Sequence, residues 1–394
     1  MKQDRAIQLW DGGRNFFSRS LQALGDSFAM ILLVEAFEAD LLHKSILGGA
    51  MGLGLLLGAP FLRVCQSSSW NASRLLALLM GISGLACFLA AWATNIWVYI
   101  IFVTVAYIMP YAGIPLSTEI YSQYDSKHRG NRFLSSVILS NLGVLVFAGL
   151  GGWFIEGGGT RGILLSGFAV VAWISMLCSL MIPCEKVKRN FKSLGQMWTT
   201  LAQDRLFRYM CIAWFMMGTA NLWLYPYRTN YLLEDQFGHN MSPEMVVLLV
   251  VMVPECLRLV SSPIFAWLFD RINFILLRMF LNALFGIYTI IFFTSTSFSG
   301  ALVGMMVLGV AQGGGMIAWQ LWVTRLAPKE KAPGYMAVHT FLTGIRRVCT
   351  PLLGLWALQN WGGLACSSIS LVLIGVSIIM MAFLIPMGRQ RFVH

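Results

Sequence analysis

Residues 73–94 read SRLLALLMGISGLACFLAAWAT, and this stretch sets the expectation for the whole chain. Its one charged side chain, Arg74, stands at its start, and the rest of the run is apolar or small. A helix of about 20 such residues crosses the hydrocarbon core of a bilayer. The stretch therefore predicts a membrane-spanning helix.

Comparable runs recur along the chain. Hydrophobic residues make up 57% of the 394 residues and charged residues 11%, whereas soluble domains carry about 25% charge. Closed barrels, the other spanning architecture, show alternating strands of about ten residues rather than long apolar runs. We expect an all-α integral membrane protein with twelve transmembrane helices. The predicted spans are residues 15–36, 45–64, 73–94, 96–119, 133–156, 160–182, 207–233, 242–268, 274–294, 297–324, 335–358 and 363–386.

The spans fall into two sets of six with matching landmarks. Arg63 and Arg271 each end an even-numbered span, and Gly130 and Gly334 each begin an odd-numbered span. Repeated landmarks indicate a duplicated structural plan. We expect three parts: a six-helix bundle over residues 1–182, a cytoplasmic linker over residues 183–206 and a second, pseudo-symmetric six-helix bundle over residues 207–394.

The net charge of +11 follows membrane topology and does not suggest nucleic-acid binding. With the N-terminus in the cytoplasm, 22 of the 28 Lys and Arg residues, Arg278 among them, are expected on the cytoplasmic side, and only Lys44 and Arg161 fall outside. This asymmetry is the positive-inside pattern. We expect a multi-pass protein of the cell membrane with both termini in the cytoplasm, and a basic linker that meets anionic lipid headgroups.

The chain shows no pattern of an enzyme or a metal protein. Its eight cysteines include no CxxC pair, and its five histidines are scattered. Neither an HExxH zinc motif nor a GxxxxGK[ST] phosphate loop is present. We therefore expect no enzyme activity, no cofactor, no metal and no direct drive by ATP.

Ionisable residues inside the spans are the first candidates for a substrate or coupling site, because such groups are costly in a bilayer. Asp26 lies midway along the first span and shares a helical face with Gln22. Glu255 and Arg258 stand at i and i+3, in reach of each other. Either pair can be a static structural contact or a proton-sensitive one.

Arg346 and Arg347 lie near the middle of the eleventh span. Successive helical residues point about 100° apart, so the two cannot share a partner. We expect one to meet Glu255 or an anionic substrate, and the other to pair with Asp26 or a backbone carbonyl. Arg228 and Asn221 form part of a polar stripe on the seventh span, which indicates either a translocation path or interfacial snorkelling.

A loop motif gives the chain a family resemblance. The sequence AWLFDR at Ala266–Arg271 is similar to the G-x-L-x-D-R signature of the major facilitator superfamily. The first-half copy, GAPFLR at Gly58–Arg63, keeps the Gly and the Arg, but Leu62 takes the Asp position. The resemblance implies a cytoplasmic latch made by Asp270, Arg271 and Arg63. By position, we expect the start of the eleventh span, near Gly334 and Tyr335, to accept Asp270.

The resemblance also implies a cavity lined by the first, fourth, seventh and tenth spans. It adds four pocket candidates, each of which can equally be a packing residue: Tyr107, Tyr111, Gln312 and Trp319. The fifth span keeps Gly143 and the Gly151-Gly152 pair of the family's antiporter motif, but Phe147 and Ala148 replace its Gly-Pro step.

Together these features predict a secondary transporter. Paired bundles with a midplane site suit alternating access. Arg228, Arg258, Arg346 and Arg347, which we place inside the membrane, favour an anionic or zwitterionic small solute, whereas the aromatic content equally suits an amphipathic one. Carboxylates and a histidine favour protons as the coupling ion, with another ion such as sodium as the alternative, and one duplicated chain can act as a monomer. The alternatives are a lipid or lysolipid flippase on the same fold and a non-transporting receptor or assembly factor.

Overall fold

The computed structural model describes residues 2–19, 21, 24, 28–37, 41–65, 68–124, 129–186, 195–233, 241, 245–246 and 248–391. Within these ranges the chain is helical, and no strand occurs in them. The expectation of an all-α protein is confirmed.

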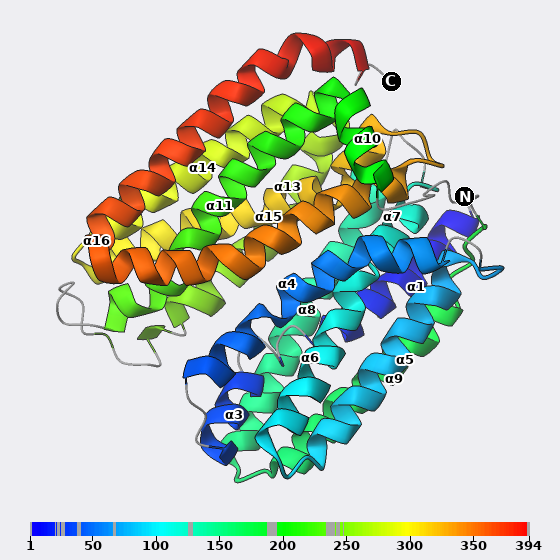
Figure 1. The fold of residues 1–394 in the computed structure, drawn as a ribbon, viewed down its shortest axis with the longest axis vertical. Coiled ribbons are helices and arrows are strands. Elements are labelled where there is room, and N and C mark those ends of the chain that lie inside the picture. The colour runs from blue at the N-terminus through cyan, green and yellow to red at the C-terminus, as the bar shows by residue number, and fades with distance from the viewer. Residues whose placement is uncertain are drawn as a thin grey trace. The chain divides into compact units, whose positions relative to one another are not determined.

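Figure 1 shows the helices in chain order, coloured from blue at the N-terminus to red at the C-terminus. In the described part of the chain they begin with α1 (Lys2–Ser18), α3 (Ala29–Phe37), α4 (Leu41–Val64), α5 (Ala72–Ala91), α6 (Ile96–Ala112), α7 (Ile114–Tyr121), α8 (Arg129–Glu156), α9 (Arg161–Leu180) and α10 (Gly195–Gln203). They are followed by α11 (Arg205–Leu233), the π-helical turn η5 (Leu248–Met252), α13 (Val253–Arg271), α14 (Phe274–Thr294), α15 (Phe298–Leu326) and α16 (Ala332–Arg391).

The last of these, α16, is two helices joined at a bend. Gly362 has φ 78° and ψ 170° inside α16, a conformation that only glycine adopts at little cost. Figure 1 shows the resulting turn between the orange and red parts of the ribbon.

Several helices begin at an asparagine cap. The Asn71 side chain accepts the backbone N–H of Arg74 at 3.1 Å, and Asn95 and Asn273 cap α6 and α14 in the same way. The first N–H groups of a helix lack partners inside the helix, and an Asn side chain satisfies one of them. These caps explain why spans separated by only a few residues start where they do.

Eight helical segments in the described part of the chain are long and apolar enough to cross a membrane. They are Ala72–Ala91, Ile96–Tyr121, Arg129–Phe154, Arg161–Leu180, Leu248–Arg271, Phe274–Thr294, Phe298–Leu326 and Asn360–Met387. The multi-pass expectation is confirmed, and the number twelve stays a prediction.

The chain packs into two compact units. The N-terminal unit comprises Met1–Asp125, Ser135–Met197 and Ala327–Gly344, and the C-terminal unit comprises Ser126–Leu134, Trp198–Leu326 and Ile345–His394. The start of α8 therefore belongs to the C-terminal unit, and the start of α16 belongs to the N-terminal unit.

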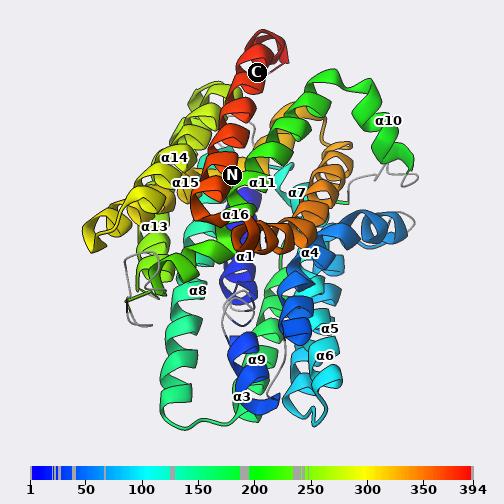
Figure 2. The ribbon, with the colours of Figure 1, turned by 60° about the vertical axis from the view of Figure 1, so that its left-hand side comes forward.

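Each unit has its own apolar core. In the N-terminal unit α5 packs against α6 and α9, and the buried side chains include Leu24, Tyr99 and Phe168. In the C-terminal unit α15 packs against α13 and α14, with Tyr288 and Phe292 in the core. Figures 1 and 2 show α13, α14 and α15 side by side.

Candidate functional site

Asp270, at the end of α13, caps the start of α8. Its Oδ1 accepts the backbone N–H of Gly130 at 2.8 Å, and its Oδ2 accepts that of Asn131 at 3.0 Å. A carboxylate is stabilised at a helix N-terminus by the unpaired N–H groups and by the helix dipole. Gly130 permits this approach, because a Cβ there would lie 2.6 Å from the Ala266 carbonyl oxygen.

The arginine that pairs with Asp270 is Arg325 and not Arg271 of the motif. Arg325 places Nη2 3.5 Å from Asp270 Oδ1 and donates to the Phe269 carbonyl at 2.6 Å. Arg271 is exposed, and its guanidinium lies 4.6 Å from the Trp267 ring centroid. The cap therefore ties the end of α13 to the ends of α8 and α15.

The predicted acceptor for Asp270, near Gly334 and Tyr335 at the eleventh span, was wrong. The carboxylate contacts the start of α8, the fifth predicted span. The start of any helix offers free N–H groups, so the sequence alone does not select between two candidate helices. In the first-half copy, Leu62 is 1% exposed and Arg63 is exposed at the last turn of α4.

Arg346 is buried against the backbone of α11. Its side chain is 6% exposed, and Nη1 donates to the Trp214 carbonyl at 2.6 Å. The guanidinium lies on Gly218, where a Cβ would be 2.0 Å from Arg346 Cζ. A backbone carbonyl was one of the partners expected for Arg346 and Arg347, and Arg346 has this partner in the structure. Arg347 is half-buried beside it.

Arg278 was assigned from sequence to the cytoplasmic charges, but it is only 4% exposed. Its guanidinium carbon lies 3.7 Å from the centre of the Trp214 ring. Trp214 stacks in turn on Trp322 at 6.0 Å between centroids. Arg278 and Arg346 therefore both contact Trp214. The expected cytoplasmic position of Arg278 did not indicate that its side chain is buried.

Two of the other predicted pairs or stripes have defined contacts. Glu255 and Arg258 form the expected ion pair along α13 and are partly buried. Arg228 is 3% exposed, and its guanidinium lies 4.4 Å from the Tyr225 ring centroid.

The remaining pocket candidates lie on separate helices. Tyr107 and Tyr111 stack at 6.2 Å between centroids on α6. Half-buried positions are occupied by Asn221 on α11 and by Gln312 and Trp319 on α15. Gln22 and Asp26 lie outside the described residues.

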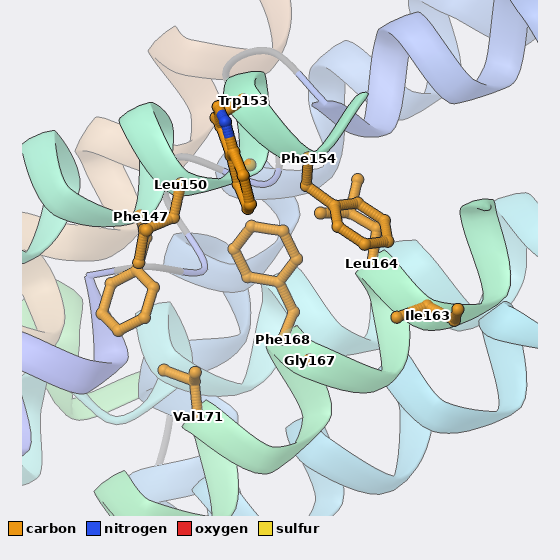
Figure 3. Close-up of a pocket in the computed structure, with 10 residues that line it drawn as sticks. Phe147, Leu150, Trp153, Phe154, Ile163, Leu164, Gly167, Phe168 and Val171 are labelled. Atoms are coloured by element: carbon orange, nitrogen blue, oxygen red, sulfur yellow. The ribbon is translucent and has the colours of Figure 1, made fainter. Parts of the chain in front are cut away.

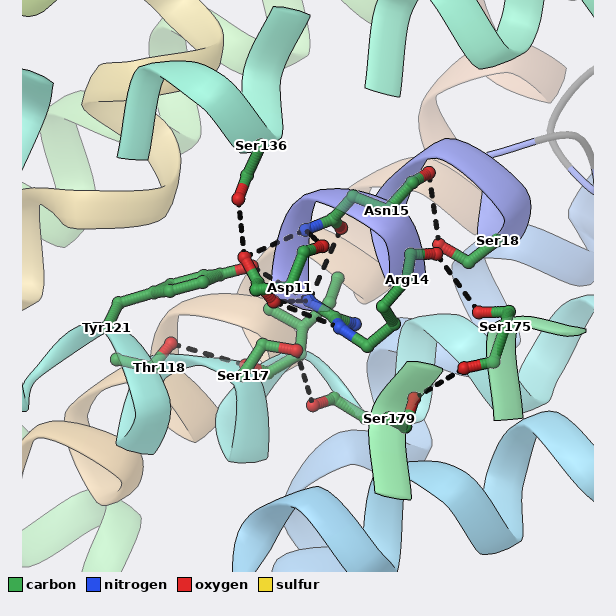
Figure 4. A network of polar contacts seen from close by, with 12 residues as sticks. Asp11, Arg14, Asn15, Ser18, Ser117, Thr118, Tyr121, Ser136, Ser175 and Ser179 are labelled. Atoms are coloured by element: carbon green, nitrogen blue, oxygen red, sulfur yellow. Dashed lines mark hydrogen bonds and ion pairs between the residues drawn. The ribbon is translucent and has the colours of Figure 1, made fainter. Parts of the chain in front are cut away.

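A buried polar network in the N-terminal unit contains none of the site residues expected from sequence (Figure 4). Asp11 is fully buried and accepts from Arg14 at 2.7 Å and from Ser136 at 2.6 Å. Arg14 also donates to the Tyr121 hydroxyl at 3.0 Å, and its carbonyl accepts from Ser175 at 3.0 Å. The network ties α1 to α7, α8 and α9. The i, i+3 spacing of Asp11 and Arg14 was a signal available in the sequence.

An apolar hollow lies between α8 and α9 (Figure 3). It encloses about 300 Å³ and is lined by Phe147, Leu150, Gly151, Trp153, Phe154, Ile163, Leu164, Gly167, Phe168 and Val171. Gly167 contributes to the space, since a Cβ at that position would meet no atom within 4 Å.

Solved structures of transporters superpose on nearly the whole chain. The proton:xylose symporter XylE, bound to 6-bromo-6-deoxy-D-glucose, is 14% identical, with a TM-score of 0.74 over 98% of this chain and 96% of that one. The human organic anion transporter MFSD10 is 12% identical, with a TM-score of 0.79 over 96% and 99%. The E. coli fucose:proton symporter FucP is 13% identical, with a TM-score of 0.72 over 97% and 99%.

At these identities the superpositions show a shared fold. No curated protein matches the chain. The sequence model of the Major Facilitator Superfamily, however, matches residues 16–345, which is most of the chain. The resemblance carried by Ala266–Arg271 is thereby confirmed, and the chain belongs to the Major Facilitator Superfamily.

Proposed function

We propose that the protein is a secondary active transporter that moves a small organic solute across the cell membrane by alternating access. The observation that carries this proposal is the family match over residues 16–345, together with a fold shared with solute symporters over nearly the full chain. In the proposal, residues 1–182 and 207–394 form two six-helix bundles joined by the 183–206 linker, and a monomer with cytoplasmic termini is the working unit.

The proposed solute is anionic, zwitterionic or amphipathic. Arg228 and Arg346 are both buried on helices of the C-terminal unit. Buried charges require a compensating partner or a function. The fold neighbour MFSD10 is an organic anion transporter, which agrees with this direction.

Protons are the proposed coupling ion. XylE and FucP are proton symporters of the same fold. In this chain the carboxylates proposed to bind the proton are Asp26 and Glu255. Glu255 already has a cationic partner in Arg258, so protonation would break an existing pair. Release of Arg258 from that pair is the proposed link to the conformational change.

The direct test is solute flux in proteoliposomes that enclose a pH-sensitive dye. Carboxylates, amino acids, sugars and amphipathic drugs are added from outside under an imposed proton gradient. We expect one solute class to enter together with protons, and Asp26→Asn or Glu255→Gln to reduce the proton signal. If the folded protein moves no solute and a stable protein partner co-purifies with it, the protein is instead a receptor or assembly factor.

A lipid or lysolipid flippase is the second candidate, and the apolar hollow between α8 and α9 favours it. The hollow has the apolar lining that an acyl chain requires. Gly167→Leu adds apolar volume to the lining of the hollow, and the Cβ at this position meets no atom within 4 Å. Under the flippase reading this variant loses lysolipid movement in vesicles and keeps its melting temperature. Unchanged lysolipid movement in the variant would remove the hollow from consideration.

A further inference from the structure

Two arginines of the C-terminal unit converge on Trp214 from different helices. Arg278, on α14, lies over the ring, with its guanidinium carbon 3.7 Å from the ring centroid. Arg346, on α16, donates to the backbone carbonyl of the same residue at 2.6 Å. Both side chains are more than nine-tenths buried, and their positive charges repel each other.

The described part of the C-terminal unit contains no carboxylate left over for this pair. Its acidic residues there are Asp204, Glu255 and Asp270. Asp204 accepts the Phe207 N–H at the start of α11, Glu255 pairs with Arg258, and Asp270 caps α8 and meets Arg325. Each carboxylate therefore has a partner elsewhere.

Each of the two guanidinium groups has an N–H donor without an acceptor among the described residues. The Nε atoms of Arg278 and Arg346 are buried and have no hydrogen-bond partner among the described residues. A guanidinium carries five N–H donors in a planar fork that matches a carboxylate or a phosphate. Two buried, mutually repelling forks with unused donors are suited to one anion between them.

We propose that Arg278 and Arg346 form a binding site for a carboxylate or phosphate group. The assignment rests on the proposed function in one respect, since it makes that group part of the transported solute or of a lipid headgroup. Gly218 is a positioning residue, because its missing side chain lets the Arg346 guanidinium lie on α11. The stacked rings of Trp214 and Trp322 hold the Arg278 side.

The experiment is thermal unfolding of the full chain in nanodiscs of phosphatidylcholine. Succinate and inorganic phosphate are the probes, each compared with chloride at equal ionic strength. A ligand that binds the folded state raises the melting temperature in proportion to its occupancy. A second set of nanodiscs contains phosphatidylglycerol, without added anion.

We expect succinate or phosphate to raise the melting temperature in neutral nanodiscs if the group belongs to a soluble solute. A rise only with phosphatidylglycerol would assign the same site to a lipid headgroup. No rise in any arm overturns the proposal.

The variants separate binding from packing. Arg278→Gln removes one of two repelling charges, so we expect the anion-free melting temperature to hold or rise, and the anion affinity to fall at least tenfold. Arg278→Lys, which keeps the charge without the fork, serves if the glutamine variant does not fold. Arg74→Gln, an exposed arginine in the other unit, is the matched control and keeps the full shift.

Two results contradict the proposal. One is a fall in the anion-free melting temperature of Arg278→Gln with the anion shift intact, which would make Arg278 a packing residue. The other is loss of the shift in Arg74→Gln, which would indicate nonspecific charge screening. An anion shift that depends on Arg278, without solute flux in proteoliposomes, would keep the site and reject the transport function.

Discussion

Arg14 in the N-terminal unit and Arg346 in the C-terminal unit are equally buried, at 6% exposed each. Arg14 has a carboxylate at 2.7 Å and a tyrosine hydroxyl at 3.0 Å. Arg346 has a backbone carbonyl and a like-charged neighbour in Arg278. The first arginine is balanced by a carboxylate of its own unit, whereas the second has no carboxylate partner among the residues that the structure describes. Burial alone therefore does not separate a structural arginine from a binding one, and the inventory of partners does.

The largest effect is expected where the balanced site is broken. Asp11→Asn keeps the shape of the side chain and leaves Arg14 buried without a counter-charge. Breaking a buried ion pair in this way costs about 3–5 kcal/mol. Equilibrium unfolding in detergent, followed by tryptophan fluorescence, measures the loss.

Asp204→Asn is the matched control for that change. Asp204 accepts the Phe207 N–H as a helix cap, and asparagine caps as well as aspartate does. We expect the free energy of unfolding to change by about 0.5 kcal/mol or less. Equal losses in the two variants would mean that the charge of Asp11 contributes no more than an ordinary hydrogen bond.

A smaller loss is expected from Gly218→Ala, which displaces Arg346. The added methyl group would occupy the position of the guanidinium, so the Arg346 side chain must move away from the Trp214 carbonyl. A buried donor that loses its acceptor costs about 1–3 kcal/mol. Gly167→Ala is the control, because its new Cβ meets open space and gains about 0.5–1 kcal/mol in a helix interior. Thermal unfolding of both variants measures these changes. A Gly218→Ala variant that is as stabilised as Gly167→Ala would contradict the contact between the Arg346 guanidinium and Gly218.

Asp270→Ala tests the carboxylate that the C-terminal unit does use. It removes two N–H acceptors at the start of α8, and loss of a helix cap costs about 1 kcal/mol. We expect faster hydrogen exchange at Gly130 and Asn131, measured by mass spectrometry. Unchanged exchange there, with exchange increased at the start of α16, would restore the acceptor first expected from the sequence.

The smallest change in stability is expected from giving Arg346 an internal partner. Thr350 is buried at i+4 from Arg346 on α16, so an aspartate at this position is in reach of the guanidinium. The attraction within a buried ion pair is largely offset by the desolvation of the two charges. Thr350→Asp should therefore fold normally and lose the anion-induced shift, whereas Thr350→Asn should keep it. A full shift in Thr350→Asp would place the anion away from Arg346.

The helical architecture could be predicted from sequence because the bilayer restricts the choice of structure so strongly. Apolar runs of spanning length and asparagine caps are local signals, and the Ala266–Arg271 motif identified the family. The contacts of Asp270, Arg278 and Asp11 are long-range, however. The start of α8 and the start of α16 offer the same N–H groups, so only the packing shows which one Asp270 caps.

Arg278 and Asp11 show a second limit of the sequence. Both lie close to polar loop sequences, and the positive-inside rule assigns charge to a side of the membrane without saying which side chains are buried. Arg278 was therefore taken as a loop charge, although it lies on a tryptophan in the core. Periodicity did place Glu255 beside Arg258, because that pair lies on one helix.

The measurement that tests the central claim is solute uptake into proteoliposomes, followed both as current on a solid-supported membrane and as internal pH, for the native chain, Arg346→Gln and Arg74→Gln. Internal pH is followed because co-transport of one proton with a monovalent anion carries no net charge. A transporter of an anionic solute predicts a signal that follows addition of one solute class, persists in Arg74→Gln and disappears in Arg346→Gln. A signal of equal size in Arg346→Gln would separate transport from the arginine site. No change of current or of internal pH with any solute, from protein that unfolds at its normal temperature, would contradict the transporter assignment itself.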